Sequence, residues 1–560
     1  MSSRLNKIKL VILLCACLGV AAFLLGSFNS RASAQVEQLN AAEQRGKQIY
    51  LRGESTGSPE IVVLLEGGET EVPATSFTCA SCHGLTGEGT AEGGLTAPSL
   101  VWSALTNSHT SALTTIERGA YTEATLIRAV RLGLDPAGRR LHPGMPHYRM
   151  TDGQAADLVA YIKKLGHELD PGVSETTVKI GAALPLTGPL ASLGQDIKDT
   201  LSAALAEANE HGGIYGRRFE LVVEDSRGDV SGTREATRRL IESDGVFAIA
   251  GSFEPKGADN TNELLKQAEV PLVGPVTLSP HLSLPPNRFI FYLLPTFNHQ
   301  ARSLVDFISV PRTRGQVVDS AQATSRQTTP QQASPQRRVS AAVIYMNGEL
   351  EADALEGLRA QARLRSVDIV FEQRYESGRF APAQVVEAMA RKKPDYVFFF
   401  GASADIMSCA REMERARLSA PLVTSVMMLG REAFDLSPET AARVLLAYPS
   451  ALPDQSDFAE FLNVMQRRSV RLSSPAFQTI AYASAKTLIE AVKLSSKKLS
   501  RATLISALEG MRDYRTGVIP PVSFGPNRRV GVEGSFVVGI DLNNKRYVAL
   551  SEQLVPQDRQ

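Results

Sequence analysis

Blocks of apolar and polar residues alternate with a regular rhythm from about residue 176 onward. Short apolar runs such as Val178–Leu184 alternate with longer segments such as Leu193–Glu210, whose apolar residues recur at helical spacing. The other strand-like runs of this first series are Phe219–Asp225, Val246–Ala250 and Pro271–Val276. Strands separated by helical segments predict a parallel sheet with helices on both faces.

The same rhythm restarts in the second half of the chain. Its strand-like runs are Val339–Tyr345, Ile369–Tyr375, Tyr396–Phe400 and Leu422–Val426. Two doubly wound α/β units in one chain predict a two-lobed module over residues 176–553, with its ligand site in the cleft at the carboxyl ends of the strands. We expect the first lobe to contain residues 176–298 and 450–516, and the second lobe residues 299–449 and 517–553.

A polar segment interrupts the second lobe. Residues 311–338 are rich in Gln, Ser, Thr, Pro and Arg, and they lack the apolar content that a packed core requires. We therefore predict a disordered insert there.

The N-terminal part of the chain has helical rather than alternating periodicity. Ala41–Leu51 has helical spacing, and Thr151–Leu165 reads as an amphipathic helix capped by Thr151. Its predicted buried stripe consists of Leu158, Tyr161, Ile162 and Leu165. We expect an all-α domain over residues 36–168, joined to the two-lobed module by a linker at 169–175.

Composition narrows the class of protein. The 560 residues are 43% hydrophobic and 21% charged, which is an ordinary globular balance. The formal net charge of +1 gives no support to a nucleic-acid-binding protein. Only the run Leu10–Leu25 is apolar enough to enter a bilayer, so a polytopic membrane protein is excluded.

The first 34 residues resemble an export signal. Basic residues precede the apolar run, and Ala32-Ser-Ala34 follows it as a small-residue cleavage site. We predict a signal peptide over residues 1–34 and a periplasmic protein. An uncleaved anchor is the alternative, which the run's shortness disfavours. The signal contains four basic and no acidic residues, so its removal leaves a mildly acidic protein.

The segment Cys79-Ala-Ser-Cys82-His83 has the C-x-x-C-H spacing at which a c-type haem is attached. Two thiols must each form a thioether with one porphyrin, and the adjoining histidine must place a ring nitrogen beneath the iron. A disulfide redox pair would not explain His83. Half a zinc site would need a second cysteine pair, which the sequence lacks. We predict one covalent haem c.

The sixth iron ligand should lie on a loop between this motif and the last helix. Met145, in Gly144-Met-Pro146, is the preferred candidate; the alternatives are Met150, His109, His142 and His147. Residues 40–166 resemble the class I cytochromes c, which carry such a Met-Pro loop just before the final helix. The long insert Arg52–Thr78 departs from that pattern. Trp102 either packs on the porphyrin or belongs to the core.

Ligation by both His83 and Met145 would leave the iron without an open position for substrate. Such a haem carries single electrons and performs no bond chemistry. The sequence also lacks a G-x-S-x-G elbow, an H-E-x-x-H motif and a phosphate-binding glycine loop. Cys409 lies in a helical segment and is expected to be a buried structural cysteine. We therefore expect an electron carrier and not an enzyme.

The two-lobed module resembles the type I periplasmic binding proteins of the branched-chain amino-acid transporter group. The resemblance is carried by the opening run Val178–Leu190, by Ala250-Gly-Ser252 and Val270–Pro275, by Lys393–Val397, and by the helix Phe477–Leu494. It implies a leucine-binding-like fold, a small-molecule ligand between the lobes and an association with an ABC permease.

One loop departs from this family. Its amino-acid binders carry a serine-rich loop after the third strand, but here that loop reads Gly251-Ser-Phe-Glu-Pro-Lys256. Pro255 offers neither a hydroxyl nor an N–H. We therefore expect a small ligand that is not a simple α-amino acid. The candidate ligand-binding residues are Thr187, Ser252, Phe253, Thr277, Tyr345 and Ser403; Ser403 is alternatively a helix cap.

These features together predict an exported c-type cytochrome fused to a solute-binding module, with a redox protein as its partner. Two alternatives stay open. One is a transporter-associated binding protein with an accessory haem. The other is an electron-transfer subunit of a periplasmic dehydrogenase.

Overall fold

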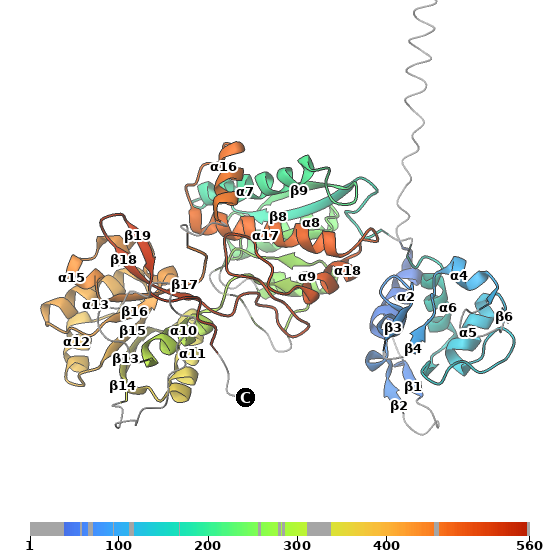
Figure 1. Cartoon of the computed structure of the whole chain (residues 1–560), viewed down its shortest axis with the longest axis horizontal. Helices are drawn as coiled ribbons and strands as arrows, with labels where there is room; N and C mark the ends of the chain where they lie inside the picture. Colours follow the sequence, from blue (N-terminus) through green and yellow to red (C-terminus); the bar gives the residue numbers. More distant parts are fainter. Residues whose placement is uncertain are drawn as a thin grey trace, which may run out of the picture. The chain divides into compact units, whose positions relative to one another are not determined.

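The computed structural model describes residues 39–556 except 56–58, 65–70, 93–94, 111–116, 167–168, 256–258, 278–279, 281, 283–285, 311–337 and 453–457. The expected signal peptide, and the expected insert apart from Arg338, lie outside these residues. The chain divides into two compact units, with the boundary after Leu169 (Figure 1).

The first unit is built from short helices with small antiparallel sheets between them. Its helices are α2 (Ala41–Arg52), η1 (Ala74–Ser76), α3 (Cys79–His83), α4 (Trp102–Thr106), α5 (Glu123–Leu132) and α6 (Asp152–Ile162). Its strands are β1 (Val62–Leu64), β2 (Glu71–Pro73), β3 (Thr90–Glu92), β4 (Leu95–Ala97), β5 (His109–Thr110), β6 (Glu117–Arg118) and β7 (His147–Arg149).

Helices α2 and α6 form the frame of this unit. Thr151 caps α6 as the sequence predicts, in a reciprocal capping box with Gln154. The predicted apolar stripe is buried: Leu158, Tyr161, Ile162 and Leu165 are each 1% exposed. The helices pack so closely that a Cβ on Gly46 would lie 1.9 Å from the Asp157 carbonyl oxygen. Only glycine permits this crossing.

The sequence did not predict any strand pairing in the first unit. Strands β1, β2 and β7 form an antiparallel sheet in the order β2-β1-β7. The first two strands belong to the insert between α2 and α3, and β7 immediately follows the Met-Pro loop. The insert is therefore paired with the rest of the domain rather than projecting from it.

The second unit contains two sheets, each with helices packed around it (Figure 1). The first lobe has a five-stranded parallel sheet in the order β12-β11-β10-β8-β9. Its elements are β8 (Thr177–Leu184), α7 (Ala191–Glu210), β9 (Arg218–Asp225), α8 (Val230–Glu242), β10 (Ala248–Ala250), α9 (Asp259–Ala268), β11 (Leu272–Val273), β12 (Ile290–Phe291), α16 (Phe458–Arg467), α17 (Pro475–Leu494) and α18 (Arg501–Gly510).

The second lobe has a seven-stranded sheet in the order β14-β13-β15-β16-β17-β18-β19. Five strands are parallel, and the last two pair antiparallel, which the sequence rhythm did not reveal. Its elements are α10 (Phe297–Ser309), β13 (Ser340–Met346), α11 (Glu349–Arg365), β14 (Asp368–Tyr375), α12 (Pro382–Ala390), β15 (Tyr396–Phe400), α13 (Ser403–Arg415), β16 (Leu422–Ser425), α14 (Val426–Leu429), η2 (Gly430–Asp435), α15 (Pro438–Ala441), β17 (Val444–Tyr448), β18 (Phe536–Asp541) and β19 (Arg546–Ala549).

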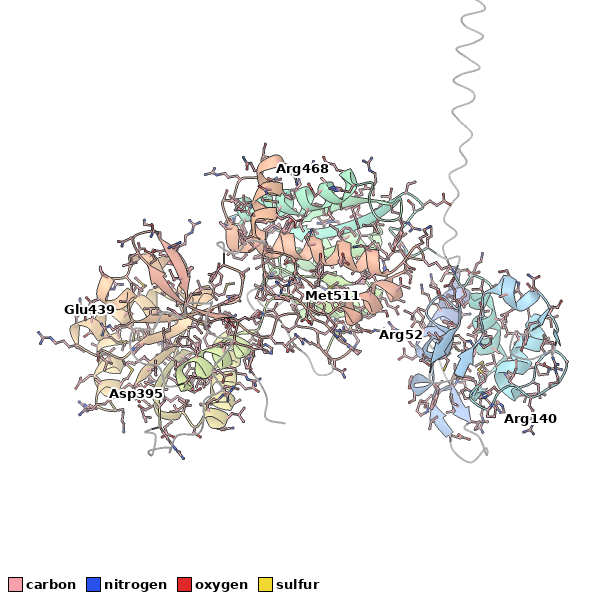
Figure 2. All side chains as sticks on the ribbon, in the orientation of Figure 1. Arg52, Arg140, Asp395, Glu439, Arg468 and Met511 are labelled. Atoms are coloured by element: carbon pink, nitrogen blue, oxygen red, sulfur yellow. The ribbon has the colours of Figure 1, made fainter. Side chains whose placement is uncertain are left out.

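Helices α16 and α17 return the chain to the first lobe. The Ser484 hydroxyl of α17 donates to the Gly274 carbonyl oxygen at 2.6 Å, just after β11. Arg468, labelled in Figure 2 at the end of α16, forms an ion pair of 2.7 Å with Glu210 at the end of α7. These contacts join segments that lie more than 200 residues apart in sequence.

The final crossing to the second lobe comes later than residue 517, where we had placed it. The Gly531 N–H donates to the Tyr292 carbonyl oxygen at 2.8 Å, and the Val532 N–H donates to that of Leu293 at 3.1 Å. Residues up to Val532 therefore extend the first sheet beside β12. The expected boundary was wrong because the residues near Val530 pair with the first sheet although they do not form the strong apolar run by which a strand is predicted.

The expected linker 169–175 is also corrected by the structure. Asp170 is 7% exposed and its carboxylate accepts a hydrogen bond from the Arg501 N–H of α18. Val173 is 4% exposed, and a Cβ on Gly172 would lie 2.3 Å from the Phe247 nitrogen. The segment 170–175 is thus packed on the first lobe, because the Asp170 carboxylate is bonded to α18 and the Val173 side chain is buried.

Candidate functional site

The candidate haem-attachment residues lie on one short helix. The Thr78 side chain caps α3 by accepting a hydrogen bond from the Ser81 N–H at 3.2 Å. Cys79 and Cys82 are three residues apart, which places both thiols on the same side of the helix. Cys79 is half-buried, Cys82 is exposed, and neither is in a disulfide. Burial raises the pKa of the Cys79 thiol to about 12.

The imidazole of His83 is held in a defined orientation. Its side chain is buried, and Nδ1 lies 2.8 Å from the Pro98 carbonyl oxygen. A carbonyl can only accept, so Nδ1 carries the proton and Nε2 keeps its lone pair. Burial lowers the pKa of His83, and the hydrogen bond to Pro98, which would raise it, only partly offsets this effect. The lowered pKa favours the neutral ring. Neutral imidazole is the form that ligates a metal.

The two candidate methionines lie on the same apolar core as Cys79. Met145 and Met150 are both partly buried against it. The Met145 N–H donates to the His142 carbonyl oxygen at 2.8 Å, which closes a turn in the Met-Pro loop. Arg131 donates to the Met150 carbonyl oxygen at 2.9 Å, so the junction between β7 and α6 is fixed to α5.

The candidate histidines are placed less favourably. His142 and His147 are exposed, and Nδ1 of His142 accepts the Gly144 N–H at 3.0 Å. The side chain of His109 lies outside the described residues. Trp102 is partly buried against the core, with the Lys163 ammonium 5.5 Å from its ring centroid. This contact supports a packing role for the ring without assigning it to the porphyrin.

The residues of this region fit a c-type haem. They offer two thiols on one helix face, a buried imidazole with its Nε2 lone pair retained, and a thioether on a partly buried loop. The side chains around them are apolar; those partly buried against the core include Leu85, Leu100, Trp102, Ile127 and Leu141. A porphyrin needs such an apolar wall, and its iron needs soft or imidazole ligands.

In the first lobe, three of the candidate ligand residues lie at the carboxyl ends of β10 and β11. Phe253 pairs with Val276, next to the half-buried Thr277. Ser252 is 3% exposed, and its hydroxyl oxygen accepts the Ala183 N–H of β8 at 2.9 Å. The Ser252 hydroxyl is therefore already bound to the sheet.

Thr187 is also engaged within the protein. Its hydroxyl donates to the Asp225 carboxylate at 2.7 Å, and the N–H groups of Leu186 and Arg227 donate to the same carboxylate. Burial alone would raise the pKa of Asp225, but these three donors and the Thr187 N–H together outweigh burial and lower it. The network fixes the loop after β8 against the end of β9.

In the second lobe, Tyr345 and Ser403 occupy different surroundings. The Tyr345 hydroxyl donates to Glu372 at 3.3 Å, and its pKa is raised by burial and then by that carboxylate. Tyr345 and Asn347 line a groove of about 470 Å³ along α11 and β14, together with Arg359, Arg363 and Arg374. The Ser403 hydroxyl donates to the Leu429 carbonyl oxygen at 2.8 Å. Ala402, not Ser403, is the cap of α13.

The known protein families agree with these two units. The family model for Periplasmic binding protein matches residues 177–546, which is more than half of the chain. The chain belongs to the periplasmic binding protein family. The family model for Cytochrome c matches residues 72–166, so the first unit is a cytochrome c domain. Both are non-catalytic families. The predicted fold class is confirmed.

Curated relatives resemble only part of the binding unit. Leu/Ile/Val-binding protein homolog 2 of Brucella abortus (strain 2308) is 31% identical over 109 residues, covering 20% of this chain and 29% of that protein. Leu/Ile/Val-binding protein BraC3 of Rhizobium johnstonii is 28% identical over 111 residues, covering 20% and 30%. The chain thus spans less than a third of the length of these relatives.

Solved structures show the same fold over the whole binding unit. A putative branched-chain amino acid ABC transporter from Rhodospirillum rubrum matches with a TM-score of 0.54 at 18% identity, covering 67% of this chain and 100% of that one. A branched chain amino acid ABC transporter from Thermus thermophilus with bound valine matches with a TM-score of 0.51 at 17% identity, covering 69% and 97%. A fatty acid ABC transporter substrate-binding protein from Thermomonospora curvata also has a TM-score of 0.51, at 17% identity with 69% and 95% coverage.

The binding protein shows two further features within the described residues. None of their helices combines the length and apolarity needed to cross a membrane. Cys409 is fully buried in α13, as predicted, and burial raises its thiol pKa to about 12.

The sequence interpretation missed the strands in the insert of the cytochrome domain. The apolar run Ile61–Leu65 followed by Gly67-Gly68 is the pattern that could have indicated them.

Proposed function

We propose that this protein is an exported, periplasmic c-type cytochrome whose single covalent haem transfers electrons, fused to a module that closes on a small molecule. The observation that carries the proposal is the orientation of His83 within the Cys79–His83 helix. The bond between Nδ1 and the Pro98 carbonyl directs Nε2 to act as the ligand. A lone C-x-x-C pair would not need this arrangement.

Four residues would hold the haem. Cys79 and Cys82 would supply the thioether bonds, and His83 and Met145 would ligate the iron. When bound, such a haem takes up and releases single electrons. The protein's part would be to hold the haem by these four side chains and to surround it with apolar residues, which would exclude substrate from the metal.

The cleft of the binding unit is proposed to take a small ligand other than a simple α-amino acid. The internal bonds of Ser252, Thr187 and Ser403 support this proposal, since these hydroxyls already have partners. Pro255 further reduces the donors of the first-lobe loop. Calorimetry with leucine and valine should therefore show no binding tighter than about 1 mM. Micromolar binding of either amino acid would contradict this proposal.

Two kinds of partner follow from the proposed function. The cytochrome domain requires a redox protein to exchange electrons with, and the binding-protein family implies an ABC permease. The names of the relatives, Leu/Ile/Val-binding proteins and ABC transporter components, support the second partner.

Mass spectrometry of the native protein from its own host tests the whole proposal. We expect a mass increase of one haem that survives denaturation, a peptide containing both Cys79 and Cys82 that carries it, and a start near residue 35. A mass without haem would overturn the cytochrome assignment. A small molecule released on denaturation would identify the cleft ligand directly.

A further inference from the structure

The insert between α2 and α3 is attached to the strand that follows the Met-Pro loop. Val63 of β1 pairs with Tyr148 of β7, and Leu64 pairs with His147. Strand β7 begins two residues after Met145. Ile61 and Val63 are 1% and 0% exposed, so the insert contributes to the domain core rather than lying on its surface.

Tyr148 also links this strand to the haem-attachment helix. Its side chain is 6% exposed, and its hydroxyl donates to the Phe77 carbonyl oxygen at 2.7 Å. Phe77 precedes Cys79 by two residues. Burial raises the pKa of Tyr148, so the hydroxyl keeps the proton that it donates. One side chain thus connects the segment before the cysteines with the segment after Met145.

Further bonds fix both ends of the insert. Near its start, the Pro59 carbonyl oxygen accepts a hydrogen bond of 2.8 Å from Nε2 of Gln154, whose Oε1 accepts the N–H of the α6 cap Thr151. Near its end, Glu71 forms an ion pair of 2.6 Å with Arg149 of β7. A Cβ on Gly53, which follows Arg52 (labelled in Figure 2), would lie 2.2 Å from the Ala74 carbonyl oxygen. The described part of the insert is therefore fastened to α6 near its start and to β7 near its end.

We propose that strands β1 and β2 of the insert form a clamp that holds the Met145 loop at a fixed place relative to the Cys79–His83 helix, with Tyr148 as the positioning residue. The inference rests on the proposed function, because it takes Met145 as the sixth ligand. A loop fixed at β7 cannot swing away, so an outside ligand must displace Met145 without help from loop opening. Loosening the clamp should make that displacement easier.

The test uses the full-length haem protein and imidazole as the competing ligand. Tyr148→Phe keeps the ring and removes the hydroxyl, which leaves the Phe77 carbonyl without its donor. We expect the ferric protein to bind imidazole roughly two- to tenfold more tightly, which corresponds to the net contribution of one partly buried hydrogen bond. The sulfur-to-iron charge-transfer band should weaken, and the reduction potential should fall.

Tyr50→Phe is the matched control. Tyr50 is buried too, with 0% of its side chain exposed, and its hydroxyl donates to the Gly84 carbonyl oxygen at 2.7 Å, beside His83. This variant loses a bond of the same kind outside the clamp. It should lower the unfolding temperature about as much as Tyr148→Phe does, while the imidazole affinity and the charge-transfer band stay unchanged.

Two further variants keep the inference separate from the ligand assignment. Met145→Ala should abolish the charge-transfer band; an unchanged band would overturn Met145 as the ligand and the clamp proposal with it. Val63→Ala, which loosens β1 against β7, should tighten imidazole binding as Tyr148→Phe does. If Met145→Ala behaves as expected but Tyr148→Phe and Tyr50→Phe shift imidazole affinity equally, or not at all, the clamp is overturned while the proposed function stands.

Discussion

The candidate haem-binding residues and the candidate ligand-binding residues differ in whether their polar groups already have partners within the protein. On α3, the thiols of Cys79 and Cys82 are in no disulfide, and the bond between His83 and Pro98 leaves Nε2 for a ligand. In the binding unit, the hydroxyls of Ser252 and Ser403 are bonded to the backbone of the protein itself. The thiols and Nε2 of the first unit thus remain suited to bind a cofactor, whereas the serine hydroxyls of the second unit hold loops in place.

The difference arises from how each site is built. The haem motif is five consecutive residues on one helix, so its geometry is local and is set by helical spacing. The proposed ligand site would be assembled from loops at the ends of several strands, and each loop has backbone N–H and C=O groups that need partners. A serine or threonine in such a loop often satisfies those groups, so its presence is weak evidence for a ligand contact.

Among the substitutions that test this difference, the removal of both attachment cysteines should have the largest effect, a complete loss of covalently bound haem. Cys79→Ala with Cys82→Ala should abolish covalent haem, since no other cysteine pair exists in the chain after the first 34 residues. The loss would be measured as the amount of haem that stays with the polypeptide on denaturing gels, compared with the unsubstituted protein. Cys409→Ala is the control: it removes the buried thiol of α13 and should leave the haem content unchanged.

Replacing Ser252 should affect stability rather than ligand contacts. Ser252→Ala leaves the buried Ala183 N–H without an acceptor and should lower the free energy of unfolding of the binding unit by about 1–3 kcal/mol. Denaturant unfolding followed by far-ultraviolet circular dichroism would measure this loss. Thr187→Ala, at an exposed position, should cost no more than about 0.5 kcal/mol. An unchanged stability in Ser252→Ala would favour a ligand role for that hydroxyl.

The smallest expected effect is a pH dependence at Asp225. Hydrogen bonds from Thr187 and two backbone N–H groups lower the pKa of its carboxyl in the folded protein. The stabilisation is fully present above the unfolded-state pKa of about 3.9 and is lost as the pH falls through the lower folded value. Asp225→Asn should flatten the fall in stability below about pH 4. Thr187→Ala should produce part of the same change; a steeper fall in either variant would contradict this account.

Helices with strong periodicity were predicted closely. The structure places α2 at Ala41–Arg52 and α7 at Ala191–Glu210, each within two residues of expectation. Thr151 is the predicted cap of α6, and the structure adds that it forms a capping box with Gln154. Short strands were harder: β1 and β2 have three residues each, too few for alternation to be distinct from chance. The pairing of residues near Val530 with Tyr292 was missed for the same reason.

The sequence by itself determined the chemistry that depends on spacing: the haem motif, the capped helices and the alternation of strands and helices. These are local features, because consecutive residues on one element have a fixed geometry. Only the tertiary structure decided that 170–175 is packed on the first lobe, that Tyr148 joins the Met145 loop to Phe77, and that the cleft hydroxyls are already bonded. Each of these contacts joins residues far apart in the chain, and hydrogen-bond partners at that range depend on how the elements pack.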